Sequence, residues 1–178
     1  MLERKKINQG KASALKTGLE TLEKQGFKFA ISMDCDGQHS VENLEGFFKE
    51  IETVGNEFSG VLLGARSLSP KEMPFSRVLS NRITTAVLSK LAGQKLFDSQ
   101  CGYRAYSLNL LSEYKAVKSK GFQWESEVLV QISWLGNYVR KVPVHTIYGD
   151  EKSQISPFED TFLFIQLWVR LLKEKLLR

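Results

Sequence analysis

Residues 27–39 constrain this chain more than any other segment, because an apolar run ends there abruptly in two carboxylates. The run from Phe27 to Met33 predicts a buried β-strand, and Asp34 and Asp36 follow it with one residue between them. Where the backbone bends at a strand end, two such carboxylates can point to the same side and share one hard divalent cation. That kind of cation keeps several waters and is completed by substrate phosphates. The segment therefore predicts a Mg²⁺ or Mn²⁺ site that holds a diphosphate.

The same Asp-x-Asp-Gly sequence also fits a solvated turn that binds no metal. Gln38 and His39 add oxygen and nitrogen donors directly after the turn. Together with the apolar strand in front, these donors favour the metal site over the turn. Mg²⁺ and Mn²⁺ both accept oxygen ligands in octahedral geometry, so the sequence does not choose between them.

The size and charge of the chain indicate one globular domain with an anionic partner. Its 178 residues are enough for a single domain with a real core, and we expect that domain to cover residues 1–178. The net charge of +5 suits a nucleotide, a lipid phosphate, a membrane surface or nucleic acid. A nucleic-acid-binding module is disfavoured, because the chain has no aromatic and basic stripe, helix-turn-helix signature or zinc spacing.

The two cysteines and the apolar runs bear on location. Cys35 and Cys101 stand in unrelated contexts, which predicts neither a zinc site nor a disulfide framework. No apolar run approaches the roughly 18 residues expected of a membrane span. These features predict a cytoplasmic protein. The last predicted helix has an apolar face and a basic end, which leaves contact with the cytoplasmic face of a membrane open, although core packing is the commoner use of such a face.

Hydrophobic periodicity predicts alternating helices and strands, the pattern of an α/β fold with a mostly parallel sheet flanked by helices. The predicted helices cover residues 11–25, 41–53, 76–91, 124–135 and 161–178. The predicted strands cover residues 27–33, 60–64 and 138–148, with a loop and a short strand within 97–107. Pro143 lacks a backbone donor, so we expect its strand to lie near a sheet edge.

Cationic and acidic residues outside the carboxylate pair are further candidates. Arg66 directly follows a predicted strand and Arg77 begins a predicted helix, where a planar guanidinium can bind phosphate oxygens, although either also fits an ordinary surface arginine. Residues 98–104 combine an acid, an amide, a thiol, a glycine and a base, and a polar turn is the alternative. Glu125 lies in a first helical turn, which the helix dipole alone would favour, but its carboxylate can also act as a general base.

Taken in order, these segments resemble the GT-A family 2 glycosyltransferases of the dolichyl-phosphate mannose or glucose synthase type. The likeness runs through nearly the whole chain, and the shared order and spacing of the motifs carry it. The matching segments are Asn8-Gln9-Gly10-Lys11, Asp34-Cys35-Asp36 with Gln38, Gly64-Ala65-Arg66, Arg77 with Ser80-Asn81, residues 98–104, residues 122–127, Val142-Pro143-Val144 and residues 153–160. Gln154 departs from the His or Lys that the family has at its position.

The resemblance implies a GT-A-like, Rossmann-like fold and inverting, metal-dependent transfer of a sugar from a nucleotide-diphosphate-sugar to a polyprenyl phosphate or similar acceptor. It implies that the Mg²⁺ or Mn²⁺ ion is held by Asp34, Asp36 and Gln38. It assigns the phosphates to Gly10, Lys11, Arg66, Arg77 and Arg104. An ionised lipid phosphate needs no base, whereas a sugar hydroxyl would need one, for which the candidates are Glu125 and, behind it, Asp98.

The family also implies a segment that this chain does not contain. Family members carry a further βαβα unit before the Asn8 segment, and its first strand grips the nucleotide base. We therefore expect an N-terminally truncated sheet that is either a fragment of an enzyme or completed by another chain. The alternative is a non-catalytic remnant that retains the metal corner and the acceptor half.

Overall fold

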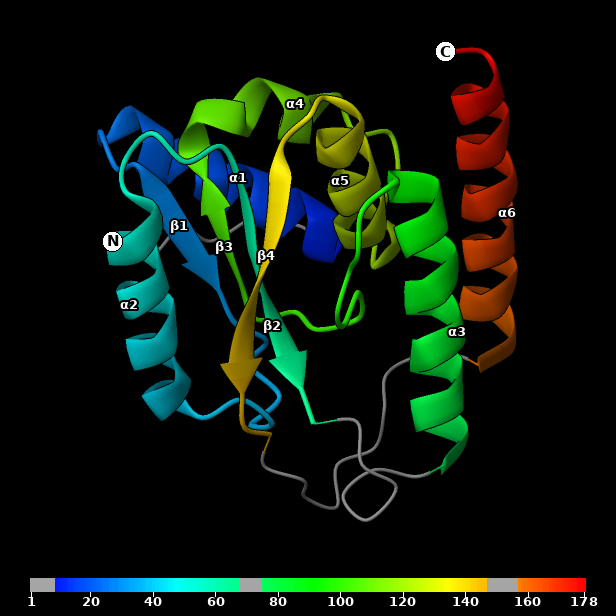
Figure 1. The fold of residues 1–178 in the computed structure, drawn as a ribbon, viewed down its shortest axis with the longest axis horizontal. Coiled ribbons are helices and arrows are strands. Elements are labelled where there is room, and N and C mark those ends of the chain that lie inside the picture. The colour runs from blue at the N-terminus through cyan, green and yellow to red at the C-terminus, as the bar shows by residue number, and fades with distance from the viewer. Residues whose placement is uncertain (1–8, 68–74, 147–156) are drawn as a thin grey trace.

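The computed structural model describes residues 9–67, 75–146 and 157–178 (Figure 1). Asn8, which is part of the family resemblance, and Gln154, which departs from it, lie outside these ranges. In chain order the elements are α1 (Lys11–Lys24), β1 (Phe29–Ser32), η1 (Val41–Asn43), α2 (Leu44–Val54), β2 (Gly60–Arg66), α3 (Phe75–Ala92), β3 (Arg104–Ser107), η2 (Leu108–Leu110), α4 (Leu111–Ala116), α5 (Gln123–Trp134), β4 (Tyr138–Val144) and α6 (Pro157–Leu176).

The predicted α/β class is confirmed, and each helix and strand expected from the sequence is present within a few residues of its predicted position. The residues beyond Thr146 that were assigned to the last strand lie outside the described ranges. α4 was not predicted, because its six residues make fewer than two helical turns and show no clear periodicity.

The sheet is mixed, which corrects the expected mostly parallel pairing. Its strand order is β1-β3-β2-β4; β3 pairs antiparallel with both β1 and β2, and β2 pairs parallel with β4. β1, β2 and β4 therefore point in one direction and β3 in the other. The insertion of β3 between two co-directional strands accounts for both antiparallel pairings. β4 ends this strand order, so Pro143 lies on an edge strand, as predicted.

Helices cover the sheet and bury its central strand. Every residue from Gly60 to Ala65 in β2 is buried, and β2 lies between β3 and β4 in the sheet. α2 flanks one side of the sheet, whereas α3 and α6 lie next to each other on the far side (Figure 1). Most of α5 is buried as well, including Trp124 and Val128. Within the described residues, no helix has the length and apolar character to cross a bilayer.

The strand directions place several chain ends at one edge of the sheet. β1, β2 and β4 all finish there, and β3 starts there with Arg104. α1 runs back along the sheet before β1, which brings its first residue, Lys11, to this edge (Figure 1). Open α/β sheets bind ligands outside the carboxyl ends of their strands, so this edge is where a site is expected.

Candidate active site at the carboxyl ends of the strands

The end of β1 is fixed against the loop that precedes β3. The hydroxyl of Ser32 donates a hydrogen bond of 3.0 Å to the carbonyl oxygen of Gly102. A Cβ atom at Gly102 would collide with the carboxylate of Asp34. The glycine of the predicted 98–104 motif therefore allows the Asp34 carboxylate to lie directly against the neighbouring backbone.

The Asp36 carboxylate caps a tight turn. The backbone amide of Gln38 donates to Oδ1 of Asp36 over 3.1 Å, and Gly37 adopts a φ of 75° that glycine tolerates without strain. Asp36 is exposed, and the side chain of Asp34 is 32% exposed. The segment thus forms a tight Asp-Gly turn that leaves both carboxylates accessible to solvent.

Lys11 joins Asp34 to Glu125. Its Nζ atom lies 2.7 Å from Oδ1 of Asp34 and 2.7 Å from Oε2 of Glu125. Gly10 begins the helix with a φ of 81°, and the Phe122 ring lies 5.5 Å from the ammonium. Burial alone would lower the pKa of Lys11, but the carboxylates of Glu125 and Asp34 outweigh burial and raise it. The ammonium is therefore charged at neutral pH.

Arg104 is buried beneath the site, where it contacts backbone carbonyl oxygens. It does not fit the phosphate contact predicted for it. Its guanidinium donates to the carbonyl oxygens of Ser99, Cys101 and Glu125 at 2.7 to 2.8 Å. Its Nε atom lies 3.6 Å from Oε1 of Glu125. The side chain is 1% exposed, so it links the 98–104 loop to the start of α5 and cannot reach a ligand in solvent.

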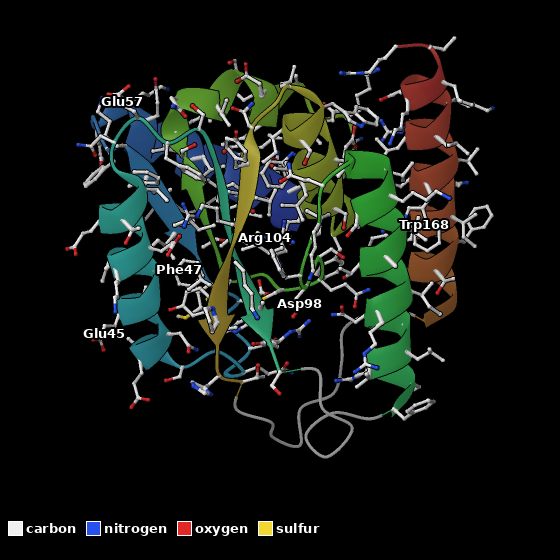
Figure 2. The ribbon with its side chains drawn as sticks, in the orientation of Figure 1. Glu45, Phe47, Glu57, Asp98, Arg104 and Trp168 are labelled. Atoms are coloured by element: carbon white, nitrogen blue, oxygen red, sulfur yellow. The ribbon has the colours of Figure 1, made fainter. Side chains whose placement is uncertain are left out.

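Asp98 orients Arg66 at the end of β2. Oδ2 and Oδ1 of Asp98 accept bonds of 2.6 and 3.0 Å from Nε and Nη2 of Arg66, and Asn81 donates over 2.6 Å. Burial alone would raise the pKa of Asp98, but the bonds from Arg66 and Asn81 hold it below its ordinary value. Figure 2 shows Asp98 beside the end of β2, between the sheet and α3. A fully buried carboxylate with these partners fits the positioning of Arg66 better than the predicted role of reserve base.

Arg77 and Gln38, the remaining candidate residues, lie on segments near the edge of the sheet where the strands end. Arg77 is exposed in the first turn of α3, one turn before Asn81. Gln38 is half-buried directly after the turn at Asp36. The structure therefore places Arg77 and Gln38 on segments that border the site.

Two residues contribute to the site in ways that the sequence did not indicate. The His39 ring packs edge-on against Tyr103 with centroids 5.2 Å apart, and its Nδ1 atom is buried without a hydrogen-bond partner. Burial lowers the pKa of His39 although Asp34 and Asp36 act in the opposite direction.

Asn43 exchanges hydrogen bonds of 2.8 and 2.9 Å with the backbone of His145. Because 102 residues separate Asn43 from His145, no local sequence signal could reveal that contact.

The donor set fits a divalent cation that relies on its substrate. Among the residues that the structure describes, no three His, Cys, Asp or Glu side chains converge closely enough to hold a metal by themselves. Asp34 and Asp36 offer two hard carboxylates, and waters and phosphates would have to complete the coordination. Mg²⁺ is commonly bound through one or two carboxylates plus substrate phosphates in this way.

The fold has solved counterparts. Glucosyl-3-phosphoglycerate synthase from Mycobacterium tuberculosis, solved in complex with Mn²⁺ and uridine-diphosphate-glucose, superposes with a TM-score of 0.61 at 13% sequence identity. The superposition covers 95% of this chain and 55% of the synthase. A likeness at this identity shows the fold, which is the GT-A fold that the sequence predicted.

No family model matches the chain, but curated relatives do. The UDP-N-acetylglucosamine--dolichyl-phosphate N-acetylglucosaminyltransferase of Methanococcus voltae is 31% identical over 149 residues, which are 80% of this chain and 57% of the relative. This relative and the shared fold support the resemblance to the family 2 glycosyltransferases that the sequence motifs carry. A second curated relative, the polyprenol monophosphomannose synthase of Mycolicibacterium smegmatis, is 24% identical over 76% of this chain and 51% of the relative. The chain thus spans a little over half the length of these curated relatives.

Proposed function

We propose that this chain carries the metal-binding and acceptor-binding side of a glycosyltransferase that moves a sugar from a nucleotide-diphosphate-sugar to a polyprenyl phosphate or similar acceptor. The names of the two curated relatives support this acceptor class, and the synthase solved with uridine-diphosphate-glucose supports the donor class. The observation that carries the proposal is the meeting of Asp34, Lys11 and Glu125 at the carboxyl ends of the strands.

A divalent ion, Mg²⁺ or Mn²⁺, is the proposed cofactor, with Asp34, Asp36 and Gln38 as its protein ligands. The two carboxylates fit such an ion, and the solved synthase binds Mn²⁺. When bound, the ion would act as a Lewis acid that neutralises negative charge on the departing nucleotide diphosphate. The remaining chemistry falls to the side chains of this chain.

Positive side chains at the strand ends are proposed to hold the phosphates. Arg66 is oriented by Asp98, so its guanidinium is set before any ligand arrives. Lys11 and the backbone at Gly10 lie at the first turn of α1, where exposed amides and the helix dipole favour anions. Arg77 in the first turn of α3 would contribute a second guanidinium.

The acceptor decides what Glu125 does. A polyprenyl phosphate is already ionised at neutral pH and can attack the anomeric carbon from the face opposite the diphosphate, which inverts that carbon. In that case Glu125 positions Lys11 and the acceptor. With a hydroxyl acceptor, Glu125 would be the general base, since its carboxylate lies at the strand ends beside Lys11 and Arg104.

Contact with an anionic membrane surface is proposed for α6. Its exposed apolar residues recur at helical spacing as Phe162, Ile165, Val169, Leu172 and Leu176. Lys173 and Lys175 lie in the last turns of the same helix. An amphipathic helix with basic residues beside its apolar face binds at anionic bilayer surfaces, where a lipid-linked acceptor would be found.

A sugar-transfer assay with Asp36→Asn tests the function. Asparagine keeps the acceptor atom that caps the Gln38 amide, so the turn and the melting temperature should be preserved. Loss of one metal ligand should lower transfer to a polyprenyl phosphate by about 100-fold or more, as expected for removal of an electrostatic contribution to the transition state. Glu45→Gln on α2 serves as a control for loss of an exposed acid, and equal activity of wild type and Asp36→Asn would contradict the proposal.

A second candidate is a non-catalytic remnant that retains the carboxylate corner at the strand ends without transferring a sugar. Calorimetry with a nucleoside diphosphate and Mn²⁺ separates it from the enzyme. Submicromolar affinity excludes the remnant, whereas the absence of any heat of binding argues against the enzyme.

A further inference from the structure

The Lys11 ammonium lies within hydrogen-bonding distance of two acids of the candidate site. It lies 2.7 Å from a carboxylate oxygen of Asp34, which follows β1, and 2.7 Å from one of Glu125, which lies in the first turn of α5. Distances this short between charged groups mark strong, charge-assisted hydrogen bonds. One flexible side chain from α1 therefore links two separate segments of the site.

The Lys11 ammonium and a divalent cation make competing demands on Asp34. Oδ1 of Asp34 already accepts a bond from Lys11, and a cation that binds this carboxylate would be repelled by an ammonium a few ångströms away. Glu125 is 6% exposed and would lose its closest positive neighbour if Lys11 moved away without replacement. Both effects oppose binding of a cation that arrives alone.

A nucleotide diphosphate removes this conflict. Its phosphates bring negative charge to the site together with the cation, and they offer the ammonium a new partner. Lysine suits such a change of partner, since its ammonium is a compact charge on a flexible four-carbon stem. The side chain of Lys11 is 23% exposed, so part of it already borders solvent.

We propose that Lys11 is the internal counter-cation of the free site, which pairs with Asp34 and Glu125 until the diphosphate and the divalent cation arrive together. The inference rests on the metal-dependent function proposed above. It makes Lys11 the residue that couples the two ligands: the cation binds weakly alone and tightly with the nucleotide. By linkage the nucleotide gains the same factor from the cation.

Mn²⁺ binding, measured by electron paramagnetic resonance without nucleotide, tests the inference. Lys11→Met keeps the length of the side chain and removes its charge, so it should tighten Mn²⁺ binding about tenfold or more, the effect of removing one nearby like charge at moderate screening. Lys16→Met, one turn or more along α1, is the matched control, because Lys16 binds the carbonyl oxygens of Lys115 and Val117 away from the acids. Its Mn²⁺ affinity should equal that of the wild type.

Repeating the titration with uridine diphosphate completes the test. The gain from Lys11→Met should disappear, because the phosphates lose their contact with the ammonium in that variant. Unchanged Mn²⁺ affinity in Lys11→Met without nucleotide would overturn the counter-cation role and leave the proposed function intact. If no variant binds Mn²⁺ even with uridine diphosphate, the proposed metal dependence fails first. Lys11→Gln repeats both titrations if Lys11→Met does not fold.

Discussion

At the scale of single residues, the site depends on glycine at position 102, because the Asp34 carboxylate fills the space that any larger side chain would need. We expect Gly102→Ala to displace the Asp34 carboxylate, because the new Cβ would occupy its position. The clash is with the end of a partly exposed side chain that can move aside, so we expect a cost of at most about 1 kcal/mol, the lower end for overpacking. Chemical denaturation measures that cost, and Mn²⁺ binding with nucleotide should weaken in parallel.

Gly18→Ala provides the control for Gly102→Ala. Gly18 lies inside α1, and a Cβ atom added there would meet no other atom within 4 Å, so alanine should raise stability by about 0.5–1 kcal/mol and leave Mn²⁺ binding unchanged. If Gly102→Ala were equally harmless, the close packing of Asp34 against the 98–104 loop would be wrong.

The sequence indicated some residue roles better than others. Asp34 and Asp36 could be predicted as an accessible pair, since both follow one apolar strand directly. The places of Arg104 and Asp98 could not, because their partners are backbone carbonyls and side chains from other segments. An arginine in a motif cannot be assigned to a phosphate or to the protein's own carbonyl oxygens until the tertiary contacts are known.

At the scale of elements, one ion pair attaches α6 to the core. Arg170 donates bonds of 2.9 and 2.6 Å to the Glu127 carboxylate on α5, and Glu127 is fully buried. Arg170→Met should leave that carboxylate without its counter-charge and destabilise the fold by about 1–3 kcal/mol, because Arg170 is 32% exposed and Glu127 keeps its bonds from Ser119 and Gln131. Hydrogen exchange should quicken in α6 more than in α2. Uniform protection in both helices would contradict this attachment.

The elements themselves were largely predictable, whereas their pairing was not. Apolar residues at helical spacing indicated α1, α2, α3, α5 and α6, and apolar runs indicated β1 and β2. The position of β3 between β1 and β2 depends on contacts between residues far apart in the chain, which periodicity does not report. The same reason explains why the mixed sheet was expected to be mostly parallel.

At the scale of the whole molecule, stability should fall in acid. Asp98 and Glu127 both have pKa values lowered in the fold by hydrogen bonds and positive partners, although burial acts in the opposite direction. Their contribution is complete above the unfolded values, about 4, and is lost as the pH falls through the lower folded values. Urea denaturation from pH 7 to pH 3 should show this decline. The Asp98→Asn variant should have a lower free energy of unfolding at pH 7 and should lose less of it between pH 7 and pH 3. If its free energy of unfolding fell with pH as steeply as that of the wild type, Asp98 would not be a cause of the acid sensitivity.

The overall arrangement also separates a candidate membrane face from the rest of the surface. α6 and α2 lie on opposite sides of the molecule (Figure 1). Leu172 on α6 is 50% exposed and Phe48 on α2 is 54% exposed, which makes them a matched pair. Leu172→Glu should abolish sedimentation with anionic vesicles, because it places a negative charge within the apolar stripe beside Lys173 and Lys175, whereas Phe48→Glu should sediment like the wild type. Neutral vesicles should retain less of the wild type and of Phe48→Glu, since the basic residues then lack their anionic partner. Equal binding of Leu172→Glu and the wild type would exclude α6 as the membrane-facing helix and leave the transfer chemistry at the strand ends unaffected.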